Sequence, residues 1–146
     1  MKNLIAILIA IVITISCNSQ KMYSDFDMSY SKSGGLAPIY ENLLIKGNNA
    51  RYSYEGQGKK IKTNFKLTNQ DIQNLNKILT QNKFRQIVED HKKLYDHVSV
   101  SINVKNGENS ANKTDASMIM PQSKNNWDRV VSAFQDIITK NVKNTQ

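Results

Sequence analysis

The 146-residue sequence offers few side chains that could catalyse a reaction or bind a metal ion. Its two histidines, His91 and His97, each follow an acidic residue, Asp90 and Asp96 respectively. Zinc-binding histidines on a helix stand four positions apart, whereas these two are six apart with an expected loop between them. Solvated loop residues therefore explain them better, and we expect no metal site and no cofactor.

The hydroxyl side chains form no recognisable catalytic set either. No Gly-x-Ser-x-Gly motif, which places a nucleophilic serine on a sharp turn, is present. Ser33-Gly34-Gly35 is too short to surround a phosphate, and no glycine-rich nucleotide motif follows it. Tyrosines are typical of strands, although they could also form a sugar- or peptide-binding platform. We expect a protein that is not an enzyme, and a hydrolase with an unrecognised site is the alternative.

The N-terminal segment indicates export. Met1-Lys2-Asn3 is a short basic start, and Leu4 to Ile15 is an almost uninterrupted apolar run. A helix of about twelve residues spans only ~18 Å, whereas a bilayer core requires about twenty residues. The run therefore matches the hydrophobic region of a signal peptide rather than a transmembrane helix.

The end of this run, Ser16-Cys17, resembles the lipobox of bacterial lipoproteins, although Thr14 stands where Leu or Val is usual. The resemblance implies that the Cys17 thiol accepts a diacylglycerol and that the chain is cut before it. Asn18 favours the outer membrane, by similarity to the enterobacterial sorting rule. We thus divide the chain into a signal peptide (1–16), a lipidated tether (17–24) and one domain (25–146).

The charge balance is strongly basic. The chain carries 20 Lys and Arg against 12 Asp and Glu, a net charge of +8, and removal of Lys2 with the signal peptide leaves +7. This excess fits a solvated surface, contact with anionic lipid, or contact with an acidic protein. A lipidated envelope protein rarely meets nucleic acid, so we expect no nucleic-acid partner. The single cysteine excludes a disulfide within one chain, and we expect a monomer.

Alternation of apolar and polar residues predicts strands at 26–31, 40–46, 51–55, 60–67 and 98–105. Asn106-Gly107 predicts a hairpin turn, and the polar strand that returns from it, at about 108–114, is expected at a sheet edge. Ala116, Met118 and Met120 also alternate before Pro121.

Periodic apolar residues predict two amphipathic helices, at about 68–82 and 125–141. Thr68 and Asp71 suit the start of the first, and Asn125 or Asn126 can cap the second. Trp127 and the other apolar residues of the second helix form a stripe that should enter the core. Together the elements predict a two-layer α+β fold in which an antiparallel sheet packs against both helices.

One combination of features extends this interpretation. The first strand runs into Ser33-Gly34-Gly35-Leu36-Ala37, Leu67-Thr68 opens a helix, and Asp96 precedes the strand Val98-Ser99-Val100-Ser101-Ile102. This order, closed by an apolar helix, resembles the emfourin family of small inhibitors of thermolysin-type metalloproteases such as protealysin. The resemblance covers roughly residues 28–142, and the chain departs from the family in its longer segment 48–66 and in its lipidation.

The resemblance implies a protein-binding loop at Ser33, Gly34, Gly35, Leu36 and Ile39, in which the glycines allow close backbone approach and Leu36 and Ile39 could fill a pocket. We expect a membrane-anchored, non-enzymatic module that binds an envelope or secreted protein, with metalloprotease inhibition as its specific form. The alternative is a structural or adaptor lipoprotein without inhibitory activity, in which these apolar residues start the second strand and face the core.

The intact mass of protein extracted from its native membrane tests the lipidation. We predict a mature chain that begins at Cys17 and carries acyl chains on it. Acyl chains contribute about 0.8 kcal/mol per buried methylene, so Cys17→Ser should remove the acyl mass and strongly weaken the attachment to the membrane. A Cys17→Ser chain that stays membrane-bound with its acyl mass intact would contradict the assignment.

Overall fold

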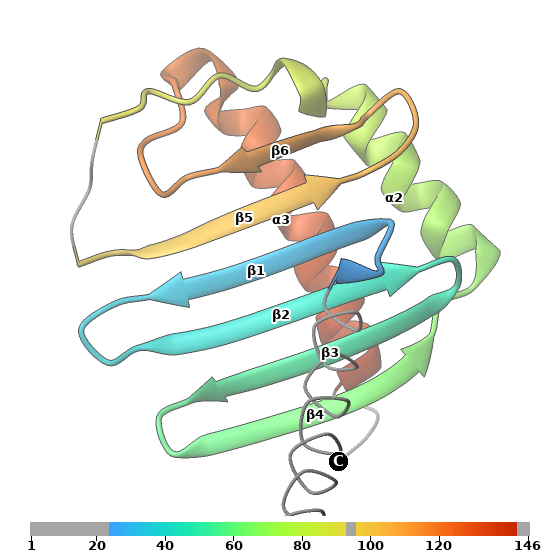
Figure 1. Ribbon diagram of the computed structural model, residues 1–146. Helices are drawn as coiled ribbons and strands as arrows, with labels where there is room; N and C mark the ends of the chain where they lie inside the picture. The colour runs from blue at the N-terminus through green and yellow to red at the C-terminus, as the bar shows by residue number, and fades with distance from the viewer. Residues whose placement is uncertain (1–23, 93–95, 143–146) are drawn as a thin grey trace, which may run out of the picture.

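The computed structural model describes residues 24–92 and 96–142. Within them the chain forms a six-stranded antiparallel sheet and two α-helices (Figure 1). The elements in chain order are β1 (Met28–Gly34), β2 (Ile39–Lys46), β3 (Asn49–Gly56), β4 (Lys59–Lys66), α2 (Asn69–Gln81), the 3-10 helix η1 (Phe84–Gln86), β5 (Val98–Val104), β6 (Ala111–Thr114) and α3 (Pro121–Val142). In space the strands follow the order β4-β3-β2-β1-β5-β6, which confirms the predicted α+β class.

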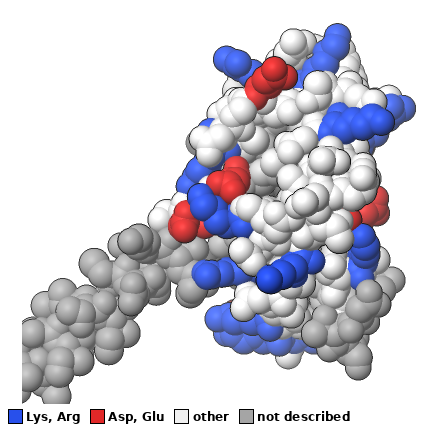
Figure 2. Space-filling model, turned by 90° about the vertical axis from the view of Figure 1, so that its right-hand side faces the viewer, with Lys and Arg blue, Asp and Glu red and all other residues white. Residues whose placement is uncertain are grey.

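Among the described residues, helices cover only one face of the sheet. Successive side chains of a strand point to opposite faces, and the apolar set, including Tyr30, Leu43 and Ile102, is buried beneath α2 and α3. The other side, here called the open face, faces the viewer in Figure 1 and carries mainly Ser, Asn, Lys and Arg. Figure 2, turned toward the strand ends, shows Lys and Arg spread over the visible surface, with several in the lower part of the molecule.

The middle of α3 supplies the centre of the core. Trp127 and Phe134 lie seven residues apart on one side of the helix and are 1% and 0% exposed, which confirms the apolar stripe. The Phe134 ring stacks on Tyr30 with centroids 5.9 Å apart and 17° between the ring planes. All buried apolar residues that the structure describes lie between Met28 and Ile138, so a chain that begins at Asn18 keeps this core whole.

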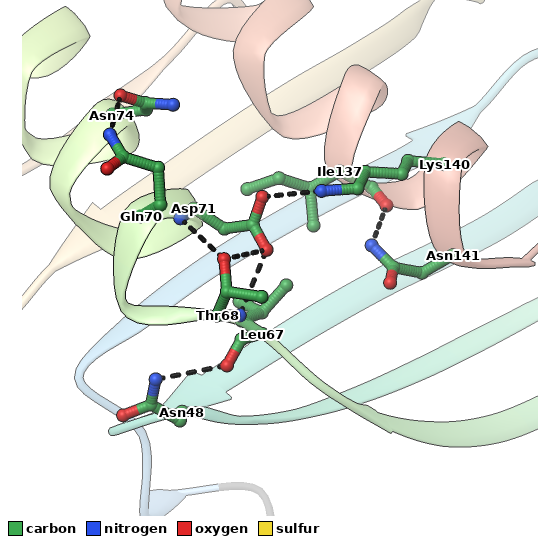
Figure 3. A network of polar contacts seen from close by, with 9 residues as sticks. All are labelled: Asn48, Leu67, Thr68, Gln70, Asp71, Asn74, Ile137, Lys140 and Asn141. Carbon is green, nitrogen blue, oxygen red and sulfur yellow. Dashed lines mark hydrogen bonds and ion pairs between the residues drawn. The ribbon is translucent and has the colours of Figure 1, made fainter.

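A capping box begins α2, and its acidic residue also contacts α3 (Figure 3). The Asp71 backbone N–H donates to Thr68 Oγ1 at 3.1 Å, and the Thr68 backbone N–H donates to Asp71 Oδ2 at 2.9 Å, as the sequence predicts. Lys140 of α3 donates to Asp71 Oδ1 at 2.8 Å. The hydrogen bond from Lys140, followed by those from Thr68, lowers the pKa of Asp71 to about 2. The start of α2 is therefore fixed to the end of α3 by a charged contact.

Two predictions about the C-terminal third were wrong. α3 begins at Pro121 rather than near Asn125, and proline fits the first turn because it has no N–H to leave unpaired there. Before the helix, Ile119 is buried and Met118 is exposed, the reverse of the expected alternation. The reason is an isolated antiparallel bridge between Glu89 and Ile119, which turns Ile119 toward the core.

The hairpin after Asn106-Gly107 was predicted correctly, but its second strand is shorter than expected. β6 spans only four residues, Ala111–Thr114, instead of 108–114, and it forms the sheet edge as predicted. Residues 105–110 form a longer loop, in which Ser110 Oγ donates to the Lys105 carbonyl oxygen at 2.9 Å. The remaining strands and α2 lie within three residues of their predicted limits.

Truncation of the central aromatic of α3 tests this packing. Phe134→Ala should lower the free energy of unfolding by about 3–5 kcal/mol, since it removes a fully buried ring and leaves a cavity. Thermal or denaturant unfolding of the chain from Asn18 measures the change. Phe26, half-buried with Lys105 Nζ 3.8 Å from its ring centroid, is the matched control, and Phe26→Ala should cost at most about 1 kcal/mol. Equal losses for the two variants would show that α3 does not organise the core.

Candidate functional site

The connection between β1 and β2 is a four-residue turn, 35–38, at one end of the sheet (Figure 1). Leu36 is 90% exposed in it. The other residues of the predicted loop are divided: Ser33 and Gly34 belong to β1, and Ile39 is the first residue of β2. The loop is therefore narrower than the sequence suggests, and Leu36 is its one large apolar side chain.

Two further exposed apolar side chains lie beside this turn. Val98, 39% exposed, is paired with Gly34 across β1 and β5 and points to the helical side of the sheet. Tyr40, 56% exposed, is paired with Ser33 and lies on the open face. We call Leu36, Tyr40 and Val98 the apolar tip. They are three of the five large apolar residues exposed in the described part of the chain.

The tip is held by close backbone packing, not by a free hinge. Gly34 has φ +111°, and a Cβ there would lie 2.5 Å from the His97 carbonyl oxygen. Gly35 has φ +87°, and a Cβ there would lie 3.1 Å from Val98 Cγ2. The positive φ angles favour glycine at both positions, and at Gly34 the space also requires it, so the turn is tightly seated, with the close backbone approach that the two glycines allow.

A hydrogen-bonded group behind β5 supports the turn. Asp115 Oδ1 accepts from the Val100 N–H at 2.6 Å, and Asp115 Oδ2 accepts from Trp127 Nε1 at 3.0 Å. The Asp115 carbonyl oxygen lies 3.0 Å from His97 Nε2. Asp115 therefore joins α3 to the start of β5, where His97 contacts Gly34. Sequence reasoning missed this residue, because nothing in the stretch 114–118 indicates a link to a tryptophan on the following helix.

Ile39 is a poorer contact residue than predicted. Its side chain is half-buried, and its Cγ2 lies 2.8 Å from the position that a Cβ on Gly56 would occupy. Ile39 thus packs closely against the backbone of Gly56 at the end of β3. Its partner-binding role stays a prediction, with less surface available to it than Leu36 has.

The histidines do not come together as a reactive pair. His91 is exposed, with φ +59°, while His97 is half-buried against Asp115. Among residues 24–92 and 96–142, no group of three or more His, Cys, Asp or Glu is placed to hold a metal ion.

Two tyrosines in the core have raised pKa values. Burial, opposed by the hydrogen bond from Gln135, raises the pKa of Tyr30 to about 12. Burial and the hydrogen bond that Tyr52 Oη donates to Glu41 Oε1, at 2.8 Å, raise the pKa of Tyr52 further. Both phenols are neutral at physiological pH, so each packs as a core side chain whose hydroxyl makes one side-chain hydrogen bond.

The predicted lipidation residue, Cys17, lies outside the described residues, as does the whole predicted signal peptide. In the part of the chain that is described, no helix combines the length and the apolar character needed to cross a membrane.

In comparisons with known proteins, no family model matches this chain, and no curated protein matches it significantly. Inferences about its function therefore depend on the tip and its surroundings.

The seating of the turn can be tested by adding a single methyl group. Gly34→Ala should lower the free energy of unfolding by about 2–3 kcal/mol, because the new Cβ collides with the His97 carbonyl and the backbone is left-handed. Gly58→Ala is the matched control: its φ is +73° but nothing lies within 4 Å of the added Cβ, so it should cost about 1 kcal/mol. Urea unfolding of both variants measures the difference, and equal values would mean that the turn is not tightly seated.

Proposed function

We propose that this chain is a membrane-anchored envelope lipoprotein whose domain is a non-enzymatic module that binds another protein through the apolar tip. The observation that carries the proposal is the 90% exposure of Leu36 on a turn that close packing holds in place. Single exposed apolar residues are common on protein surfaces. Here, however, Leu36 and Tyr40 lie at one end of the β1–β2 hairpin, and Val98 lies beside that end on β5.

The energetics favour a docking role for Leu36. Burying a leucine side chain contributes about 1.5–3 kcal/mol, and a turn whose backbone is already held in its binding conformation loses little backbone entropy when a partner binds. The two glycines provide that preorganisation, since the turn has little freedom to rearrange. Leu36 is then suited to fill an apolar pocket, such as the cleft of a protease.

The path of β1 fits an anchored module. The strand begins next to the proposed tether and ends at the tip, and its seven residues span ~24 Å at ~3.4 Å per residue. A lipid on Cys17 would hold one end of the sheet near the bilayer and leave the tip at the opposite end. Anchoring also raises the local concentration of the module near membrane-associated partners.

The partner class that we propose is an envelope or secreted metalloprotease of the thermolysin type, in keeping with the emfourin resemblance and with an apolar residue on a rigid turn. A module that binds an envelope protein without inhibiting it would use the same tip. The two are separated by whether occupancy of the tip changes the proteolytic rate.

Replacement of the tip leucine tests the proposal. The chain from Asn18 is titrated against thermolysin-type proteases, and used to capture proteins from envelope extracts. Leu36→Ser should weaken the interaction by roughly 30-fold, which corresponds to about 2 kcal/mol. It should leave the unfolding midpoint unchanged, because Leu36 makes no core contact.

Met118, an exposed apolar residue that does not belong to the apolar tip, provides the control. It is 52% exposed and precedes Ile119, the bridge partner of Glu89, so Met118→Ser should retain full affinity. Full affinity of Leu36→Ser would refute the tip as the binding site. Gly34→Val is unsuitable for this purpose, because it would disturb the fold as well as the surface.

A further inference from the structure

Three cations crowd around one amide on the open face. Lys62 and Lys66 flank Asn64 on β4, and Arg51 is paired directly with Asn64 across the β3–β4 ladder. Diagonal neighbours on one face of an antiparallel pair lie roughly 7–8 Å apart or less. Arg51 is therefore within that distance of both lysines, and all three are exposed.

None of the described acidic residues on this face pairs with Arg51, Lys62 or Lys66. The carboxylates on this side are taken by other lysines: Glu55 pairs with Lys60 at 3.0 Å, and Asp25 and Asp27 pair with Lys46 at 3.2 and 3.0 Å. No ion pair of Arg51, Lys62 or Lys66 occurs within the described residues. Like charges so close repel each other, which an anionic surface would relieve.

The cations lie beside an open hollow of mixed polar and apolar lining. The hollow, of about 600 Å³, is lined by Asn42, Leu44, Ser53 and Asn64 together with Arg51 and Lys62. Amide and hydroxyl groups there can donate hydrogen bonds to phosphate oxygens, as the cations do.

The chain enters the sheet from this same side. Lys46, on the open face of β2, holds Asp25 and Asp27 just before β1, and the first described residues, dark blue in Figure 1, lie in front of the sheet. The seven residues 18–24 reach at most ~25 Å when fully extended. A lipid on Cys17 would therefore keep the open face close to a bilayer.

We propose that Arg51, Lys62 and Lys66 form a docking surface for the anionic headgroups of a phospholipid bilayer, which lays the open face on the membrane. The proposal rests on the lipid anchor of the proposed function. It leaves Leu36 free at the end of the sheet and Val98 free on the helical side, whereas Tyr40, the tip residue on the open face, would lie toward the bilayer. Headgroup phosphates would occupy the hollow beside Asn64, and the surrounding amides would contact them.

Vesicle binding by the unlipidated chain from Asn18 tests the docking surface. Vesicles of phosphatidylcholine alone are compared with vesicles that contain about one-third phosphatidylglycerol, at low and at high salt. The triple variant Arg51→Gln, Lys62→Gln, Lys66→Gln should lose on the order of 100-fold in affinity for the anionic vesicles, since each basic residue near such a surface contributes roughly fivefold.

The control is a triple of the same composition in the helical layer: Lys77→Gln, Lys83→Gln, Arg85→Gln. These residues are exposed on α2 and around η1, so most of the affinity should remain. Circular dichroism melts establish that both triples fold. Equal losses in the two triples, equal binding to both vesicle types, or displacement by millimolar inorganic phosphate would overturn the docking surface.

The same assay separates this proposal from the protein-binding role of the tip. Leu36→Ser should bind anionic vesicles like the parent chain, and the Arg51, Lys62 and Lys66 triple should keep its affinity for the protein partner. Loss of vesicle binding in Leu36→Ser alone would mean that the tip inserts into the bilayer, which would overturn both proposals. Loss of partner binding with vesicle binding intact would leave the docking surface standing.

Discussion

The structure depends on one constraint: a six-stranded sheet has a single apolar face, and α3 must cover it. The stack of Phe134 on Tyr30 and the burial of Trp127 place this helix across the middle of the sheet. The helices do not reach the ends of the strands. Val98 shows this, since it faces the helical side of the sheet and is still 39% exposed. The exposure of Val98 is thus a direct result of strands that extend beyond the helix that buries them.

The same constraint explains why the sequence was sufficient for most of the fold. Where one face is buried and the other solvated, residue type alternates along each strand, and the strands from Met28 to Lys66 could be located from that alternation. The capping box at Thr68 could also be predicted from the sequence, because it depends on residues three positions apart. Local patterns predict local elements well, and the α+β class follows from their order.

What the sequence could not provide depends on contacts between distant segments. The Glu89–Ile119 bridge reverses which of Met118 and Ile119 is buried, and no local pattern reveals a bridge over thirty residues. The role of Asp115 between Val100 and Trp127 is hidden for the same reason. At the tip, Gly34-Gly35 was recognised as a turn, but its tight seating against His97 is visible only in three dimensions. The cation cluster required the register of β3 on β4, which aligns Arg51 between Lys62 and Lys66.

The pairing of β1 with β5 has a consequence for the order of folding. β1 to β4 form a chain of local hairpins, and β5 and β6 form another, but Met28 must find Val104 across more than seventy residues. Loop closure of that length carries an entropic cost that adjacent hairpins avoid, so this step is the natural bottleneck. Because Gly34 lies opposite Val98 in the same ladder, the turn around Leu36 acquires its shape only when this late pairing is complete. A nascent or truncated chain that lacks β5 would carry the sequence of the tip without its geometry.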